Sequence, residues 1–281
     1  MTVPDIVLNS GRTIPQLGFG VAQIGAAGTA DAVAEALRVG YRHIDTAQRY
    51  GNEQEVAEAI RNSGLNRDEV YLTSKLDNLS HRPDDARRAF DRTLQTLGFD
   101  YVDLFMIHWP LPPSYGGDFT STWRTLEEFY RDGRARSIGV SNFQVAHLRR
   151  LAAEGDVVPA VNQIEVHPYF GNEEVRTANA EHGIVTEAWS PLAVGRILAD
   201  STVGAIAGRI GRTPAQVVLR WHIQRGNVIF PKSTTPARIE ENFAIFDFQL
   251  APSDVAAISA LDRGEQGRTG PNPDVFTDVS S

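Results

Sequence analysis

Four ionisable residues follow three apolar runs of the sequence, and their types suit the reduction of a carbonyl group. Asp45 and Tyr50 come after the run that ends at Ile44, Lys75 ends the next run, and His108 ends a third. Hydride reduction requires a proton for the developing alkoxide, and tyrosine, with an ordinary pKa of about 10, is a weak acid at neutral pH. A neighbouring ammonium lowers the pKa of a phenol, and a carboxylate keeps that ammonium charged and in place.

These four residues therefore have distinct expected roles in catalysis. Tyr50 is the proton donor, Lys75 lowers the pKa of its phenol, and Asp45 holds Lys75. A neutral imidazole at His108 donates a hydrogen bond that orients the substrate oxygen. Taken singly, each residue type is more often a helix cap, a rim group or a core residue, so the hypothesis depends on their combination. An alternative makes Lys75 a Schiff-base nucleophile of an unrelated barrel enzyme.

Short β-branched runs alternate with segments of helical spacing, and this alternation predicts a parallel sheet built from βα units. Eight strands are expected, at Leu17–Gly20, Tyr41–Ile44, Val70–Lys75, Val102–His108, Ala135–Val140, Ala160–Glu165, Val185–Ala188 and Val228–Pro231. Eight such strands indicate an α/β fold, a (β/α)8 TIM barrel in one domain spanning residues 1–281. In that fold the chemistry lies at the carboxyl ends of the strands.

Helices are expected between the strands, at Thr29–Val39, Glu53–Ser63, Pro83–Leu97, Thr122–Arg131, Val145–Ala153, Asn172–Glu181, Thr213–Gln224 and Pro236–Phe243. Glycines 40, 64 and 98 mark C-terminal caps, and Thr213-Pro214 places a cap residue before a first-turn proline. Three segments fall outside the alternation: an N-terminal β-hairpin at Asp5–Pro15, which would close one end of the barrel, and two extra helices at Thr202–Ile210 and Ser253–Leu261. The tail from Gly264 to Ser281 is expected to be irregular.

Composition excludes several classes of protein. The 281 residues contain no cysteine, which excludes disulfides, thiolate metal sites and a catalytic thiol, and no metal is expected. The net charge of −8 with scattered cations disfavours nucleic-acid binding. The sequence begins without a basic and apolar leader and holds no apolar run of membrane-spanning length, which predicts a cytoplasmic protein without a membrane partner. We also expect a monomer.

The sequence around the four residues resembles the aldo-keto reductase superfamily. The segments GYRHIDTA with YGNE, HWP, RSIGVSNF, VNQIEVHP and FPKST resemble that family's signatures in order, from about Gly18 to Asn242. Within the family, TPAQVVLRWHIQRG is most similar to bacterial reductases of the 2,5-diketo-D-gluconate reductase type. The resemblance implies that the four residues are a catalytic tetrad, and that the reaction reduces a small aldehyde, ketone or keto-sugar acid.

A nicotinamide site is also implied by the resemblance. A Rossmann fingerprint is excluded, because Gln23 stands where the third glycine after Gly18 and Gly20 is needed. At the nicotinamide, the implied contacts of the carboxamide are Ser141, Asn142 and Gln163, and the implied stacking surface is Trp189. The pyrophosphate is implied to lie under Ser190, Pro191 and Leu192, and the 2′-phosphate to contact Lys232, Ser233, Thr234 and Arg238. The adenine is implied to lie near Glu241 and Asn242, and the cofactor as a whole beside Gly20, Val21 and Asp45. The cations Lys232 and Arg238 favour NADPH over NADH.

The substrate site departs from the family pattern at two positions. His108 and Trp109 match residues that contact the substrate, but Ala22 and Asp77 stand where many relatives carry aromatic residues. A wider and more polar pocket is therefore expected, and the acidic Asp77 argues against an anionic substrate such as diketogluconate. A nucleotide-sensing regulatory subunit with little turnover is the alternative function, since some members of the superfamily act mainly as partners of other proteins.

Overall fold

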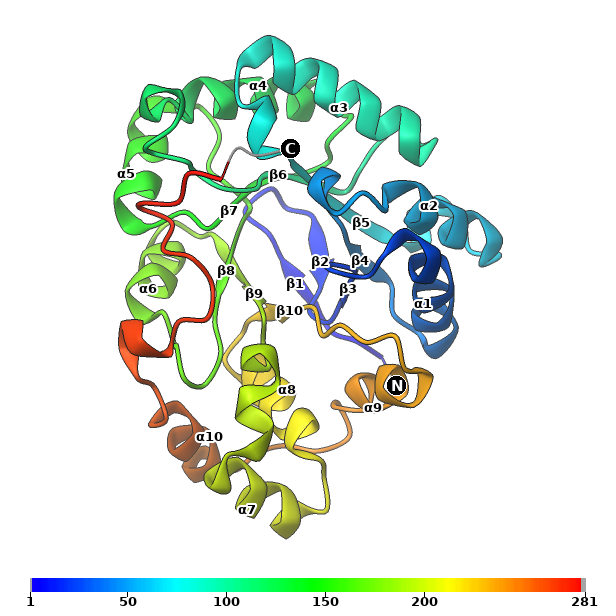
Figure 1. The fold of residues 1–281 in the computed structure, drawn as a ribbon, viewed down its shortest axis with the longest axis vertical. Coiled ribbons are helices and arrows are strands. Elements are labelled where there is room, and N and C mark those ends of the chain that lie inside the picture. Colours follow the sequence, from blue (N-terminus) through cyan, green and yellow to red (C-terminus); the bar gives the residue numbers. More distant parts are fainter. Residues whose placement is uncertain (1, 279–281) are drawn as a thin grey trace.

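The computed structural model describes residues 2–278, and its centre is a barrel of parallel strands surrounded by helices (Figure 1). The barrel strands are β3 (Phe19–Gly20), β4 (His43–Asp45), β5 (Tyr71–Leu76), β6 (Leu104–Ile107), β7 (Ile138–Ser141), β8 (Val161–Glu165), β9 (Val185–Trp189) and β10 (Val228–Ile229). Each strand pairs in parallel with the next one along the chain. A parallel bridge between Leu17 and Ile229 joins the first strand to the last, so the predicted (β/α)8 barrel is confirmed.

The helices cover the outside of the barrel as the sequence predicts. They are α1 (Ala26–Val39), α2 (Glu53–Asn62), α3 (Pro83–Leu97), α4 (Thr120–Arg131), α5 (Val145–Glu154), α6 (Glu173–Glu181), α8 (Pro214–Gln224) and α9 (Pro236–Phe243). The two extra helices are α7 (Ser201–Ile210) and α10 (Pro252–Ser259), which lie outside the ring and contact each other (Figure 1). Thr213 caps α8 by accepting a hydrogen bond from the Gln216 amide, as its position before Pro214 predicts.

Several predicted ends are wrong by a few residues. The first helix begins at Ala26 rather than Thr29, because alanine favours helix and the Thr29 hydroxyl can donate to the Gly25 carbonyl one turn back, at 3.1 Å. The strand predicted over Val102–His108 ends at Ile107, so His108 stands in the loop that follows it. Gly40 has φ of 124° and a Cβ there would lie 2.9 Å from Phe243, so the end of α1 requires glycine.

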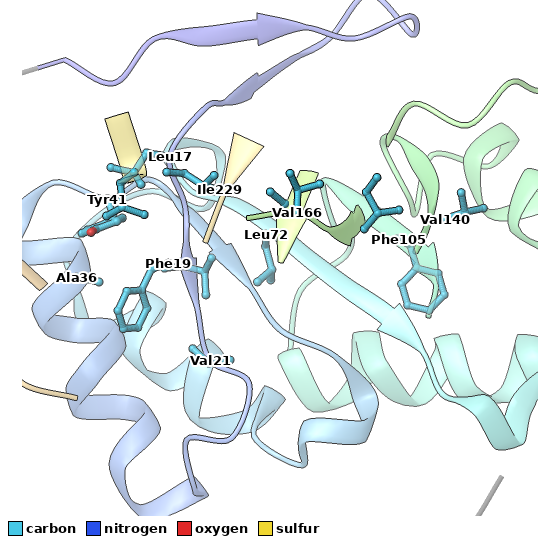
Figure 2. Close-up of a cluster of buried hydrophobic side chains, with 14 of the residues drawn as sticks. Leu17, Phe19, Val21, Ala36, Tyr41, Leu72, Phe105, Val140, Val166 and Ile229 are labelled. Atoms are coloured by element: carbon cyan, nitrogen blue, oxygen red, sulfur yellow. The ribbon is translucent and has the colours of Figure 1, made fainter. Parts of the chain in front are cut away.

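Alternate residues of the strands face two separate cores. Phe105 packs outward against Phe90 of α3, with ring centroids 4.5 Å apart, while its neighbours Leu104 and Met106 face the barrel interior. Figure 2 shows part of the outer core, where Phe19 of β3 and Tyr41 lie near Ala36 of α1 and side chains of other strands lie further along the sheet. Both faces of a parallel barrel are covered, which explains why its strands read as continuous apolar runs.

The N-terminal hairpin closes the amino end of the barrel. Strands β1 (Asp5–Val7) and β2 (Thr13–Pro15) pair antiparallel and lie within the ring of barrel strands in Figure 1. The Asn9 side chain donates to the carbonyl of Pro159, which precedes β8, at 2.9 Å. Leu8 and Ile14 of the hairpin pack into the interior core. The hairpin therefore leaves the opposite, carboxyl end of the strands as the place for a functional site.

The C-terminal tail runs across that carboxyl end. After the short 3₁₀ turn η6 (Gly264–Gly267), it passes α6 and α5 towards β6, as the red segment of Figure 1 shows. Of the tail predicted to be irregular from Gly264 to Ser281, residues 268–278 are irregular, residues 264–267 form η6, and residues 279–281 lie outside the described residues. Within residues 2–278 no helix has the length and apolar character that crossing a membrane requires.

Candidate active site

A buried ion pair joins two of the four predicted catalytic residues. Lys75 lies near the end of β5 and Asp45 at the end of β4, and parallel pairing brings these neighbouring strand ends together. The Lys75 ammonium donates to both carboxylate oxygens of Asp45 at 2.7 Å and to the Thr46 carbonyl at 3.0 Å. Burial lowers the pKa of Lys75, but Asp45 and Tyr50 outweigh it, and the net pKa is raised. Lys75 therefore keeps its charge although none of its surface is exposed.

Tyr50 lies beside this pair, in the 3₁₀ turn η1 (Gln48–Tyr50) that follows β4. Lys75 Nζ is 5.2 Å from the centroid of the phenol ring. Burial raises the pKa of Tyr50 above its ordinary value, and the Lys75 charge offsets only part of this rise. Lys75 thus lowers the pKa of Tyr50 as predicted, but the net pKa is raised, because the sequence does not show how far the phenol is removed from water. A raised pKa keeps Tyr50 protonated at neutral pH, as a proton donor must be.

His108 completes the group of four. Its ring lies edge-on to the Tyr50 ring, with centroids 5.7 Å apart. Burial lowers the pKa of His108 well below its ordinary value, and the positive charges of Lys75 and Arg49 add to this effect. The imidazole is therefore neutral at physiological pH, as predicted, and it can donate through one nitrogen. Its Nδ1 is buried and has no hydrogen-bond partner among residues 2–278.

The side-chain amide of Gln163 links this group to a carboxylate that the sequence analysis missed. Gln163 Nε2 donates to Asp45 Oδ2 at 2.9 Å and to Glu187 Oε2 at 2.8 Å. Glu187 is fully buried in β9, and burial together with the Asp45 charge raises its pKa to about 8. The sequence did offer a signal for Glu187, because an acidic residue inside the predicted buried strand Val185–Ala188 is unusual. Both hydrogens of Gln163 Nε2 are thus engaged, which leaves Oε1 to accept a bond from a ligand.

Three further residues predicted to contact the nicotinamide lie together at the ends of β7 and β9. Asn142 Oδ1 accepts from the indole nitrogen of Trp189 at 2.8 Å, and its Nδ2 donates to the His108 carbonyl at 2.9 Å and to Ser141 Oγ at 3.1 Å. The Ser141 hydroxyl donates to the main-chain carbonyl of Gln163 at 2.9 Å. This network holds the polar atoms and the indole plane in fixed relative positions, next to the residues of the predicted tetrad.

Two backbone positions at these strand ends adopt the left-handed conformation. Asn142, directly after β7, has φ of 66°, and Ser190, directly after β9, has φ of 49°. Non-glycine residues rarely adopt this conformation, and such strain clusters at functional sites, where it directs side chains. Beyond Ser190, the Pro191 carbonyl accepts from His222 at 3.1 Å and Leu192 is partly buried, so the predicted pyrophosphate loop is tied to α8.

The predicted 2′-phosphate site lies at the loop between β10 and α9. Lys232 is exposed and its ammonium donates to Gln23 Oε1 at 3.3 Å, which brings this loop against the one that follows β3. Arg238 and Thr234 are also exposed, and the Ser233 hydroxyl accepts from the Thr235 amide at 3.0 Å. Lys232 and Lys75 are the two lysines of a sequence with 27 basic residues. Lys75 stands where the predicted mechanism needs a compact charge, and Lys232 shares the predicted phosphate site with the guanidinium of Arg238.

The remaining predicted cofactor contacts are packed around that loop. A Cβ at Gly20 would lie 3.2 Å from the Phe230 side chain and carbonyl, so the residue brings β3 close to the end of β10. The Val21 amide donates to the Asp45 carbonyl at 3.1 Å. Glu241 accepts from the Thr213 hydroxyl at 2.8 Å, and Asn242 is buried. Glu241 therefore ties α9 to α8 in addition to its predicted place near an adenine.

The C-terminal tail supplies contacts that no local sequence pattern indicated. Glu165, at the end of β8, accepts from the Thr269 amide and hydroxyl at 2.6 Å each and from the Gly270 amide at 3.0 Å. His167 contacts the same carboxylate at 3.0 Å. This anchor presses Gly270 onto Trp189, since a Cβ at Gly270 would lie 2.4 Å from the indole. The tail thus packs against the Trp189 indole.

The tail also reaches the predicted substrate residue Trp109. The ring of Phe276 lies against its indole, with centroids 4.2 Å apart, and so brings an aromatic side chain to a wall expected to be polar. Asp77 caps the turn η3 (Asn78–Ser80) by accepting from the Leu79 amide at 2.8 Å. Ala22 is partly exposed. Asp77 is therefore a turn residue, and its carboxylate is already engaged in the cap.

The fold and the site together define a class of protein, the barrel oxidoreductases that pair tyrosine with a buried lysine. The chain belongs to the aldo/keto reductase family, which matches residues 16–263. An aldo-keto reductase of Mycolicibacterium smegmatis is 50% identical over 273 residues, covering 97% of this chain and 98% of that one. Methylglyoxal reductase DkgA of Yersinia pestis is 46% identical over 276 residues, covering 97% of each chain. The resemblance found in the sequence is confirmed.

Solved structures share the whole fold. The crystal structure of a Gox0644 mutant in complex with NADPH superposes with a TM-score of 0.93 at 41% identity, and the match covers 98% of this chain and 99% of that one. At this identity and coverage the two barrels are alike from the hairpin to the tail. The strand ends that carry the candidate site are therefore part of a shared framework.

Proposed function

We propose that this protein is an NADPH-dependent reductase that converts the carbonyl group of small aldehydes, ketones or keto-sugar acids to an alcohol. One observation carries the proposal: the buried Lys75–Asp45 ion pair lies beside Tyr50, which itself faces a neutral His108. The name of the related methylglyoxal reductase supports a small carbonyl substrate. The NADPH in the related crystal structure supports the cofactor.

Each of the four side chains has a separate role in proton transfer. His108 donates a hydrogen bond that holds the substrate oxygen near the Tyr50 hydroxyl. Tyr50 releases its proton to that oxygen as negative charge develops on it, and NADPH supplies the hydride that reduces the carbonyl carbon. The resulting phenolate is stabilised by Lys75, whose charge Asp45 maintains. Because burial raises the pKa of Tyr50, the phenol is ready in its protonated form before each turnover.

The residues of this chain fit NADPH. Gln163 Oε1 remains as an acceptor for a carboxamide N–H, and the partly exposed Trp189 offers its indole as a stacking surface. Lys232 and Arg238 provide exposed cations for a 2′-phosphate, a group that NADH lacks. This donor set supports NADPH as the preferred cofactor.

The Schiff-base alternative is disfavoured by the state of Lys75. An amine must lose its proton to attack a carbonyl, but the pKa of Lys75 is raised by Asp45 and Tyr50 above its ordinary value. The ammonium also donates three hydrogen bonds, to Asp45 and to the Thr46 carbonyl. Lys75 is therefore suited to act as a fixed charge and not as a nucleophile.

The test is the rate of NADPH oxidation with methylglyoxal, an aromatic aldehyde and a keto-sugar acid, followed by loss of nicotinamide absorbance. We expect turnover with NADPH, slower turnover with NADH, and a loss of roughly a thousandfold or more in kcat for Tyr50→Phe. The affinity of Tyr50→Phe for NADPH should stay close to that of the parent protein. Tight NADPH binding without turnover on any carbonyl would favour the regulatory subunit, and full activity in Tyr50→Phe would contradict the mechanism.

A further inference from the structure

Arg49 brings a cation to the edge of the proposed substrate site. It directly precedes Tyr50 in η1, and its guanidinium pairs with the carboxylate of Asp278 at 2.6 Å. It lies close enough to the imidazole of His108 that its charge lowers the pKa of that ring, in addition to burial and Lys75. Arg49 was not among the predicted site residues, although it directly precedes the predicted proton donor in the sequence.

The partner of Arg49, Asp278, belongs to the C-terminal tail. The carbonyl of Asp278 accepts from the Asn78 side chain at 2.9 Å, and Phe276, two residues earlier, lies against Trp109. These contacts bring the Asp278 carboxylate to Arg49, while the same stretch of tail packs against the predicted substrate residue Trp109. Asp77, the acidic residue expected to repel anions here, is engaged in capping the turn at Leu79. A negatively charged group is therefore already accommodated by Arg49, the residue directly before Tyr50.

We propose that Arg49 binds a carboxylate of the substrate, and that the Asp278 side chain occupies this position until such a substrate displaces it. The inference rests on the proposed reductase function and narrows it to carbonyl compounds that carry a carboxylate, such as keto-sugar acids. Arg49 is then the residue that distinguishes anionic from neutral substrates, while Tyr50 and His108 serve both.

The Arg49–Asp278 pair is well suited to exchange. The two side chains are 31% and 37% exposed, and ion pairs this open to water contribute little to stability. Displacing Asp278 is therefore a small cost for an incoming anion. The planar guanidinium binds carboxylates through two parallel hydrogen bonds, which gives direction as well as attraction.

The test compares two substrates of nearly the same shape, the anionic para-carboxybenzaldehyde and the neutral para-formylbenzamide. Because they differ in charge and not in size, a difference between them reports the effect of the carboxylate. In Arg49→Met, the ratio of kcat/KM for the acid to that for the amide should fall roughly tenfold, chiefly through the KM of the acid. Arg49→Lys should keep part of the preference. Asp278→Asn should raise the ratio, because it removes the competing carboxylate. Added salt should raise the KM of the acid in the parent protein by screening the charge.

Arg212→Met is the matched control, because Arg212 and its partner Asp247 form an ion pair of similar exposure, 27% and 42%, in which neither residue is a predicted substrate or cofactor contact. It should leave the ratio unchanged. An equal loss for both probes in Arg49→Met, or a ratio that does not move in either Arg49→Met or Asp278→Asn, would overturn the inference. If the parent protein reduces neither probe with NADPH, the proposed function itself fails. If it reduces the amide through Tyr50 without an Arg49-dependent preference, only the present inference fails.

Discussion

The amide nitrogen of Gln163 lies between the carboxylates of Asp45 and Glu187 and donates a hydrogen bond to each, at 2.9 and 2.8 Å. Two buried carboxylates this close cannot both ionise freely, since each charge disfavours the other. Asp45 pairs with Lys75, whereas burial and the Asp45 charge raise the pKa of Glu187 to about 8, so Glu187 keeps its proton at neutral pH. The Gln163 amide therefore links Asp45, which holds Lys75 beside Tyr50, to the protonated side chain of Glu187.

The first prediction concerns Glu187 and stability against pH. Its pKa is about 8 in the folded protein and near 4.5 in an unfolded chain, so folding takes up a proton between those pH values. The free energy of unfolding therefore falls as pH rises through this window, by up to roughly 1.4 kcal/mol per pH unit from this group. Glu187→Gln removes that contribution. Urea unfolding across the window should show a flatter pH dependence for the variant and a relative gain above about pH 7.

The exposed carboxylate Glu240 supplies the control for that experiment. The stability of Glu240→Gln should follow that of the parent protein at all pH values, because the Glu240 side chain is 57% exposed to water. If the free energy of unfolding of Glu187→Gln varied with pH in the same way as that of the parent protein, Glu187 would be ionised in the folded protein, which would contradict the prediction.

The second prediction concerns the buried Lys75–Asp45 pair. Lys75→Met leaves the Asp45 carboxylate buried without its cation, which should reduce the free energy of unfolding by about 3–5 kcal/mol and remove activity. The double variant Asp45→Asn, Lys75→Met removes both charges and should recover a large part of that stability, though not the activity. Urea unfolding of the two single variants and the double variant gives the coupling energy. Strictly additive losses would contradict a direct interaction between the two side chains.

The third prediction concerns contact between the tail and the stacking tryptophan. A methyl group at Gly270 would lie 2.4 Å from the Trp189 ring, and the Glu165 hydrogen bonds prevent the tail from moving away freely. Gly270→Ala should therefore displace the indole and weaken NADPH binding several-fold, as expected for a lost aromatic stacking contact. Calorimetric titration with NADPH measures the effect. Gly208→Ala, at a helix position with open space around it, is the control and should leave the affinity unchanged.

The fourth prediction concerns cofactor choice at Lys232. Lys232→Met should weaken NADPH binding by roughly tenfold, the loss of one charge-assisted hydrogen bond, and should leave NADH affinity nearly unchanged. Lys232 is exposed and Lys75 is fully buried, so an amine-reactive reagent should label Lys232 and spare Lys75, and peptide mapping identifies the label on Lys232. Saturating NADPH should protect it from labelling more than NADH does. Equal protection by both nucleotides would place the 2′-phosphate elsewhere.

Sequence alone was sufficient to predict the barrel and the types of residue at its mouth. Hydrophobic periodicity is a local property, and the carboxyl ends of parallel strands converge wherever successive βα units close into a barrel. Asp45, Lys75 and His108 could therefore be grouped from their positions after three apolar runs. The ends of short elements such as β3 were less accurate, because a two-residue strand depends on its neighbours more than on its own sequence.

Only the tertiary structure decided the protonation states and the long-range contacts. The pKa values of Tyr50 and Glu187 depend on burial, which is set by every element packed around them. Arg49 meets Asp278 across 229 positions of the chain, and no local pattern encodes a contact at that separation. The sequence thus determined which chemical groups this protein carries, whereas folding determined how far each lies from water and which charge it faces, because both depend on residues distant in the chain.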